Sequence, residues 1–263
     1  PLIGSSSQVT VLEAGHGTPA AKGAQVDVQA TVYDARTGRS LAATSYDRAQ
    51  PFRVAAGVSI PTQSGAARST IAEALTCAQT GSRIALTATG PSLGLGIDTK
   101  HVVVVIDVAS AYLGKADGAN QLPKDGMPTV VTAVDGQPGI VLQELRKPTA
   151  ARSEVVKAGG GAVLKKGQDA VLMFTAWTWP TGGEKPAVVD SLDTWAGRQA
   201  ATVALDPSSG LPAAALTALI GQKVGSQVLV VLPPAAGFGA TAPSGITADD
   251  TVVLVFDLLG VQR

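Results

Sequence analysis

The run VVVVID at residues 102–107 returns near the end of the chain as VVLVFD at residues 252–257, an offset of 150 residues. Further back, the run VDVQATVY at residues 26–33 matches AVLMFTAW at residues 170–177, at an offset of 144. Each of these earlier runs follows a Lys-Gly pair and leads to a Thr-Gly pair. Because the matching segments keep their order, the sequence predicts two copies of one unit.

The two copies also share an order of predicted elements. The alternating run after Lys-Gly predicts a strand. A short helix is expected at an Ala-Leu pair followed by Gly-Ser, which occurs in residues 74–82 and again in residues 218–226. A second strand, a Gly/Pro-rich loop and a last apolar strand complete each copy. Strands with one short helix, outside a βαβ order, predict an α+β fold with an antiparallel sheet.

The predicted domain boundaries follow from the repeat and from composition. Residues 1–114 form the first expected domain, and residues 127–263 form the second. Between them, residues 115–126 are polar and turn-rich, which predicts a linker. The run PTVVTAVD at residues 128–135 predicts an added strand at the start of the second domain.

Composition and charge exclude several classes of function. The 263 residues carry 20 basic and 20 acidic side chains, so nucleic acid and anionic membranes are not expected partners. One cysteine and two histidines rule out an internal disulfide framework and argue against a Cys/His zinc cluster. Neither a metal nor a cofactor is expected, and no apolar run is long enough for a transmembrane segment. Aromatic residues make up only 4% of the chain.

The expected location of the protein rests on the start of the chain. It begins at Pro1 with a Ser-rich stretch and contains a single cysteine. These features suggest an exported protein, a membrane-anchored lipoprotein whose signal has been removed. A monomer is expected.

The second copy resembles the FKBP-type peptidyl-prolyl cis-trans isomerases over about residues 139–262. The first copy is linked to that family through the repeat and through its PFRV run at residues 51–54. The segments that carry the resemblance are residues 164–169 (LKKGQD), 189–191 (VDS), 219–225 (LIGQKVG), 233–239 (PPAAGFG) and 251–259 (TVVLVFDLL).

The resemblance implies two tandem FKBP-like domains, each an antiparallel sheet wrapped around a short helix, with an apolar pocket between sheet and helix. Such a pocket accepts a proline side chain from a peptide or an unfolded polypeptide. Rotation about the X–Pro bond needs no nucleophile, because an apolar pocket disfavours the polar, planar amide relative to its twisted transition state. The implied activity is peptidyl-prolyl isomerisation by the second domain.

The pocket is carried over residue by residue from the resemblance. The implied catalytic residues are Asp190, Phe174 and Phe238, with Asp190 buried and facing the pocket. The implied substrate-binding residues are Val189, Trp195, Ala201, Val203, Leu211, Pro212, Ala215, Ile246, Leu254 and Phe256. Ala215 stands where the family has a tryptophan, and either Trp195 or Phe256 is expected to fill that space.

Two departures from the family keep alternatives open. Ala215 replaces the tryptophan of the pocket floor, and Phe238 replaces a loop tyrosine, so it cannot donate a hydrogen bond. A non-catalytic FKBP-fold chaperone or peptide-binding protein is therefore the competing hypothesis, and a structural surface module is a weaker one. Trp177 and Trp179 share a strand face opposite Phe174 and are expected to pack rather than bind. The first copy has only Tyr46, Asp47 and Phe52 as site candidates, so no isomerase activity is expected from it.

Overall fold

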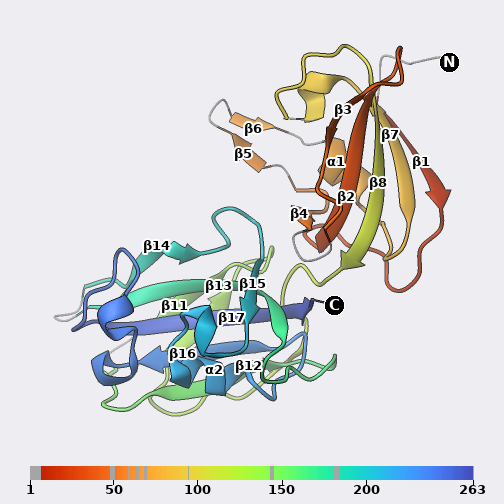
Figure 1. The fold of residues 1–263 in the computed structure, drawn as a ribbon. Coiled ribbons are helices and arrows are strands. Elements are labelled where there is room, and N and C mark those ends of the chain that lie inside the picture. The colour runs from red at the N-terminus through yellow and green to blue at the C-terminus, as the bar shows by residue number, and fades with distance from the viewer. Residues whose placement is uncertain are drawn as a thin grey trace. The chain divides into compact units, whose positions relative to one another are not determined.

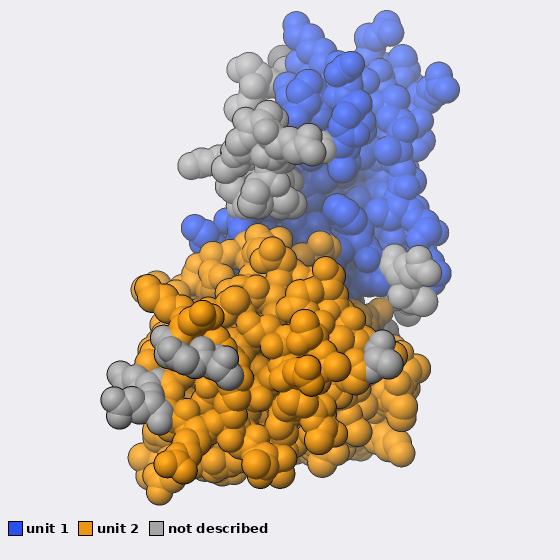
Figure 2. Space-filling model, turned by 90° about the vertical axis from the view of Figure 1, so that its left-hand side faces the viewer, with its two compact units in different colours: residues 1–114 blue, residues 115–263 orange. Residues whose placement is uncertain are grey.

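The computed structural model describes residues 7–47, 51–58, 60–62, 65–67, 70–93, 95–142, 145–180 and 184–262. The chain forms two compact units, Pro1–Gly114 and Lys115–Arg263, which are coloured blue and orange in Figure 2. Both are built mainly from antiparallel strands with few and short helices, as the sequence predicts (Figure 1). No helix in the described ranges has the length and apolar character needed to cross a membrane.

The first unit is a twisted antiparallel sheet with one short helix. Its sheet order is β1-β7-β8-β2-β3, and β4 also pairs with β2. A separate hairpin joins β5 and β6. The elements are β1 (Gln8–Glu13), β2 (Gln25–Asp34), β3 (Ser40–Ala43), β4 (Phe52–Ala55), β5 (Ile60–Thr62), β6 (Gly65–Ala67), α1 (Thr70–Ala74), β7 (Arg83–Ala88), the 3-10 turn η1 (Gly90–Leu93) and β8 (Val102–Ala111).

The second unit repeats this sheet and adds to it. Its order is β14-β13-β17-β16-β12-β9, with β15 also paired to β13 and with β10 and β11 as a separate hairpin. The elements are β9 (Ala119–Asn120), β10 (Thr129–Thr132), β11 (Pro138–Val141), β12 (Arg152–Ala158), β13 (Asp169–Trp179), β14 (Ala187–Asp193), β15 (Ala201–Ala204), η2 (Pro207–Ser209), α2 (Ala213–Leu219), β16 (Gln227–Leu232), η3 (Pro234–Ala236), η4 (Gly239–Thr241) and β17 (Thr251–Val261).

The two units share irregularities as well as strand order. The ladder between β2 and β8 shifts register after Asp27, and the ladder between β13 and β17 shifts after Val171. The edge ladders shift after Val11 in one unit and after Val155 in the other. Each pair of positions is separated by the same 144 residues as the sequence repeat, from 27 to 171 and from 11 to 155. The repeat is therefore preserved down to the placement of β-bulges, which re-aim side chains at fixed points.

The segment expected as a linker, residues 115–126, is built into the second unit instead. Its strand β9 pairs with Lys157 and Ala158 of β12. The backbone N–H of Ala116 donates to the buried carboxyl of Asp257 at 2.8 Å. Polar and turn-rich composition therefore did not signal a free connection here, because the segment satisfies its polar groups by pairing with the sheet edge.

The sheet of the second unit has two apolar faces. The inner face packs on α2, whose buried side chains are Ala215, Leu216, Ala218 and Leu219. The outer face carries Trp177 and Trp179, both 5% exposed, which pack with residues such as Val130 and Ile140 of the β10–β11 hairpin. The expectation that these tryptophans pack on the face opposite Phe174 is confirmed. Two covered faces explain why β13 and β17 are apolar almost without interruption.

Candidate functional site

The inner-face cluster of the second unit gathers most of the residues that the sequence assigns to a pocket. Phe174 on β13 lies directly across the ladder from Phe256 on β17. Their ring centroids are 5.6 Å apart with an interplanar angle of 48°, a tilted contact that aromatic pairs favour. Leu254 faces the same cluster two residues earlier on the strand. The rings are thus brought together by the pleat alone.

Ala215 belongs to the same buried cluster as Phe256, and Trp195 is not part of that cluster. Ala215 is fully buried on α2 in the same cluster as Phe256 and Leu254. Trp195 is also buried, at 2% exposed, but it belongs to another part of the unit. A Cβ added to Gly136, in the turn between β10 and β11, would lie 2.8 Å from Cη2 of Trp195. The assignment of Trp195 to the pocket is therefore wrong.

The position of Trp195 has a local cause. Asp193 Oδ1 accepts hydrogen bonds from the Trp195 backbone N–H at 3.1 Å and from Thr175 Oγ1 at 2.8 Å. Because Thr175 alternates with Phe174 along β13, these bonds tie the start of the β14–β15 loop to the outer side of the sheet. The guanidinium of Arg198 covers the indole and pairs with Asp135 in the hairpin turn. That contact lowers the pKa of the Asp135 carboxyl.

The prediction that Asp190 is buried and faces the pocket is also wrong. Val188 pairs with Trp177, and the alternation along β14 then turns Val189 inward, where it is 2% exposed. Asp190 consequently lies on the exposed side of the strand.

The rim of the cluster is apolar and partly open. Phe238, at the end of the loop after β16, is 9% exposed. Pro212 is buried and immediately precedes α2, at its N-cap position. The remaining side chains that the sequence assigns to substrate binding are half-buried against the cluster: Ala201, Val203, Leu211 and Ile246. These side chains are the part of the cluster that keeps some exposure to solvent.

In the first unit, the candidate side chains serve local structure. The Tyr46 hydroxyl lies 3.1 Å from Thr31 Oγ1, and the Asp47 carbonyl accepts a bond from Gln29. Phe52 is 43% exposed.

The sequence analysis missed a buried ion pair in that unit, in which the Arg53 guanidinium donates twice to the Asp27 carboxylate, at 2.6 and 2.8 Å. The Tyr112 hydroxyl adds a bond to Asp27 at 3.1 Å, and burial raises the pKa of Tyr112. The available signal in the sequence was Asp27 itself, because an aspartate inside an alternating strand run can indicate a buried polar contact.

The sequence analysis also missed a buried carboxyl and a cleft in the second unit. Asp257, 1% exposed, accepts bonds from Ala116 N–H and Gln227 Nε2, each 2.8 Å long. Burial raises the pKa of its carboxyl, although those bonds oppose the shift.

A cleft of about 440 Å³ opens on the outer face, between β10 and β12. In the parts of the chain that the structure covers, no group of three or more His, Cys, Asp or Glu side chains is placed to hold a metal ion.

Comparison with known proteins gives distant structural neighbours. No family model matches the sequence, and no curated protein matches it. The crystal structure of the three FKBP domains of wheat FKBP73 matches 97% of this chain and 94% of its own, with a TM-score of 0.37 and 14% identity. FkpA from Escherichia coli matches over 53% of each chain, with a TM-score of 0.36 and 21% identity. The N-terminal domain of FKBP42 from Arabidopsis thaliana matches 42% of this chain and 90% of its own, with a TM-score of 0.32 and 11% identity. All three are FKBP-domain proteins.

Proposed function

We propose that the second unit is an FKBP-like domain that binds proline-containing polypeptide segments at the rim of its inner-face cluster and catalyses their cis–trans isomerisation. The observation that carries the proposal is an apolar cluster with paired rings and an accessible edge. Phe174 and Phe256 form its base, and Phe238 lies at the edge. A proline side chain is apolar, so its burial against such an edge is favourable.

The proposed chemistry is desolvation of the prolyl amide. The planar amide is held by resonance, with a barrier of about 18–20 kcal/mol to rotation. Moving a polar amide out of water without a compensating hydrogen bond raises its free energy. The twisted transition state is less polar than the planar amide, so burial raises its free energy less and the difference between the two states becomes smaller. An apolar rim therefore lowers the barrier without an ionised or nucleophilic group.

The structure limits how large this catalysis can be. Asp190 is turned outward, and Phe238 has no hydroxyl to donate to a bound peptide. Groups that bond only to the transition state often supply a large part of enzymatic rate enhancement. Catalysis by desolvation alone should accordingly give a modest rate.

A second candidate function is peptide binding without turnover, as in a chaperone. The exposed position of Asp190 favours it, since this carboxyl is then not aimed at an amide bound to the cluster. Both functions use the same edge, and they differ only in whether the bound amide is turned over.

A protease-coupled prolyl-peptide assay separates the two functions. We expect the wild type to isomerise the peptide faster than the uncatalysed rate. In Phe238→Ala the catalysed rate should fall at least about tenfold, because the ring at the docking edge is removed. Asp190→Ala is the matched control and should leave the rate unchanged. A wild-type rate equal to the uncatalysed one rejects the isomerase. Binding of the proline peptide that persists in that case, and is lost in Phe238→Ala, would establish the binding-only function.

A further inference from the structure

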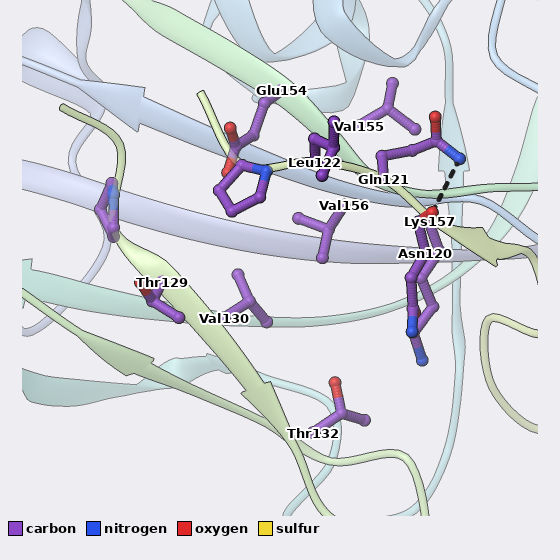
Figure 3. A pocket seen from close by; sticks show the side chains of 12 residues that line it. Asn120, Gln121, Leu122, Thr129, Val130, Thr132, Glu154, Val155, Val156 and Lys157 are labelled. Atoms are coloured by element: carbon purple, nitrogen blue, oxygen red, sulfur yellow. Dashed lines mark hydrogen bonds between the residues drawn. The ribbon is translucent and has the colours of Figure 1, made fainter. Parts of the chain in front are cut away.

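The outer-face cleft is separate from the inner-face site, because it lies on the opposite side of the same sheet. Strand β12 forms its floor, and β10 and residues 120–123 form its walls (Figure 3). Its volume of about 440 Å³ falls in the range of roughly 300–1,000 Å³ that is usual for ligand clefts. The residues of its walls were expected to be a linker and an added strand, and the predicted function uses none of the residues that line the cleft.

The floor of the cleft owes its side chains to the β-bulge in β12. The register shift lies between Val155 and Lys157, so Val156 is the extra residue. Val156 packs with the outer-face core, and Lys157 lies opposite Gln227, whose side chain bonds to Asp257 on that face. The bulge thus aims two successive side chains, one apolar and one cationic, at the same face. Figure 3 shows Val156 on the floor strand and Val130 on β10, both among the side chains that line the cleft.

The walls of the cleft offer both an apolar contact and a backbone edge. Leu122 stands at the cleft and is 92% exposed. Strand β10 pairs with β11 on one side, and within the described chain its other edge has no strand partner. An open edge presents N–H and C=O groups to which an extended peptide can add as a further strand. The cleft therefore suits an extended polypeptide better than a compact ligand.

The charges in the cleft give that polypeptide a direction. Lys157 and Asn120 are cross-strand partners, and their side chains lie next to each other at one end of the cleft (Figure 3). The Lys157 ammonium makes one long bond, 3.4 Å, to the Ala116 carbonyl, although an ammonium has three donors. Towards the other end, Glu154 is 6% exposed and accepts the Lys124 backbone N–H at 2.8 Å. The cation thus retains donors, while the carboxylate is buried and bonded.

We propose that this cleft binds the C-terminal end of an extended polypeptide, with the terminal carboxylate held by Lys157 and Asn120. The last side chains would pack on Val130 and Val156, and Leu122 would cover them. Glu154 and Lys157 lie opposite Leu229 and Gln227, so across the bulge the strand advances about two residues, or roughly 7 Å at about 3.3 Å per residue. That length corresponds to about two residues of extended chain.

The test is a comparison of two peptides that differ only at the carboxylate. A fluorescein-labelled pentapeptide of valine and threonine is prepared as the free acid and as the C-terminal amide, and binding to the full chain is measured by fluorescence anisotropy. We expect the acid to bind about tenfold more tightly than the amide, as for one charge-assisted contact. Equal binding of the two peptides, or binding of neither, would overturn the proposal.

Three variants assign the binding to the cleft. Lys157→Met should weaken binding of the free-acid peptide about tenfold and leave binding of the amide peptide unchanged. The matched control Lys165→Met, at an exposed lysine of the same unit, should change the affinity for neither peptide. Leu122→Ser, at a side chain too exposed to support folding, should weaken both peptides. An unchanged acid affinity in Lys157→Met would refute the assignment of the carboxylate. Prolyl-isomerase activity should be unaffected by all three variants, so the two proposed sites can fail independently.

Discussion

The contact between Gly136 and Trp195 gives a quantitative test of how the β10–β11 hairpin is held. Gly136 has φ +103°, and a Cβ added there would lie 2.6 Å from Lys115 Cβ and 2.8 Å from Trp195 Cη2. Gly136→Ala therefore carries two costs. A positive φ costs a non-glycine residue about 1–2 kcal/mol, and overpacking costs about 1–3 kcal/mol. We expect the second unit to lose about 2–5 kcal/mol of unfolding free energy.

Two other glycines of the same unit separate these costs. Gly167 has φ +77° with open space around it, so Gly167→Ala should lose only the backbone part, about 1–2 kcal/mol. Gly197 lies in open space without a positive φ, so Gly197→Ala should be neutral or slightly stabilising. The loss of unfolding free energy should therefore be largest for Gly136→Ala, smaller for Gly167→Ala and smallest for Gly197→Ala.

The assay is urea unfolding followed by tryptophan fluorescence. All three tryptophans lie in the second unit, so the signal reports on that unit alone. Trp195→Phe combined with Gly136→Ala should recover part of the loss, because the clashing Cη2 atom is removed. If Gly136→Ala matched Gly167→Ala within about 0.5 kcal/mol, the hairpin would not be packed on Trp195 as described, and the wall of the outer-face cleft would be mobile.

Three further outcomes are expected. Asp27→Asn should destabilise the first unit by about 3–5 kcal/mol, because it leaves the buried Arg53 guanidinium without its carboxylate. Circular dichroism should detect this loss of stability, while tryptophan fluorescence stays unchanged. A loss below about 1 kcal/mol would contradict the buried pair. The pKa of Asp257 is raised above its ordinary 3.8 by burial, so its contribution to stability is complete below 3.8 and is lost as the pH rises through the folded-state pKa. The stability of the wild type relative to Asp257→Asn should accordingly fall as the pH is raised from 3.5 to 8, and a pH-independent difference would contradict the raised pKa. Isolated residues 1–114 should not accelerate prolyl isomerisation in the protease-coupled assay, and measurable turnover would refute the assignment of activity to the second unit.

The strands were predictable because their signal is local. Alternation and the recurring VVVVID and VVLVFD runs depend on the pleat, and β8 and β17 formed where these runs occur. The direct contact of Phe174 with Phe256 was not predicted, although both residues, with Leu254, were assigned to one pocket. The structure puts Leu254 and Phe256 on the inner face, because residues two apart on a strand share a face.

The errors at the candidate site arose where the chain leaves the ladder. Asp190 and Trp195 lie in and after β14, whose ladder with β13 is irregular between Thr175 and Trp177. Between these pairs β14 advances five residues while β13 advances two, and an odd difference reverses which β14 side chains face the core. The run VVDSLD at residues 188–193 has no strict alternation of apolar and polar residues, so it does not show which side chains face the core.

The outer face could not be predicted because it depends on a segment with no counterpart in the first unit. Asp107 and Asp257 are equivalent in the repeat, yet Asp107 pairs with the partly exposed Arg83, whereas Asp257 is covered and bonds to the Ala116 N–H. The equivalent of Arg83 is Gln227, a neutral residue that can be fully buried at lower cost than a cation. Where the first unit has a partly exposed ion pair, the second unit thus has a buried carboxyl bonded to an uncharged side chain and to the backbone of this segment. The same segment forms one wall of the cleft and β10 forms the other, so the cleft depends on residues that have no counterpart in the first unit.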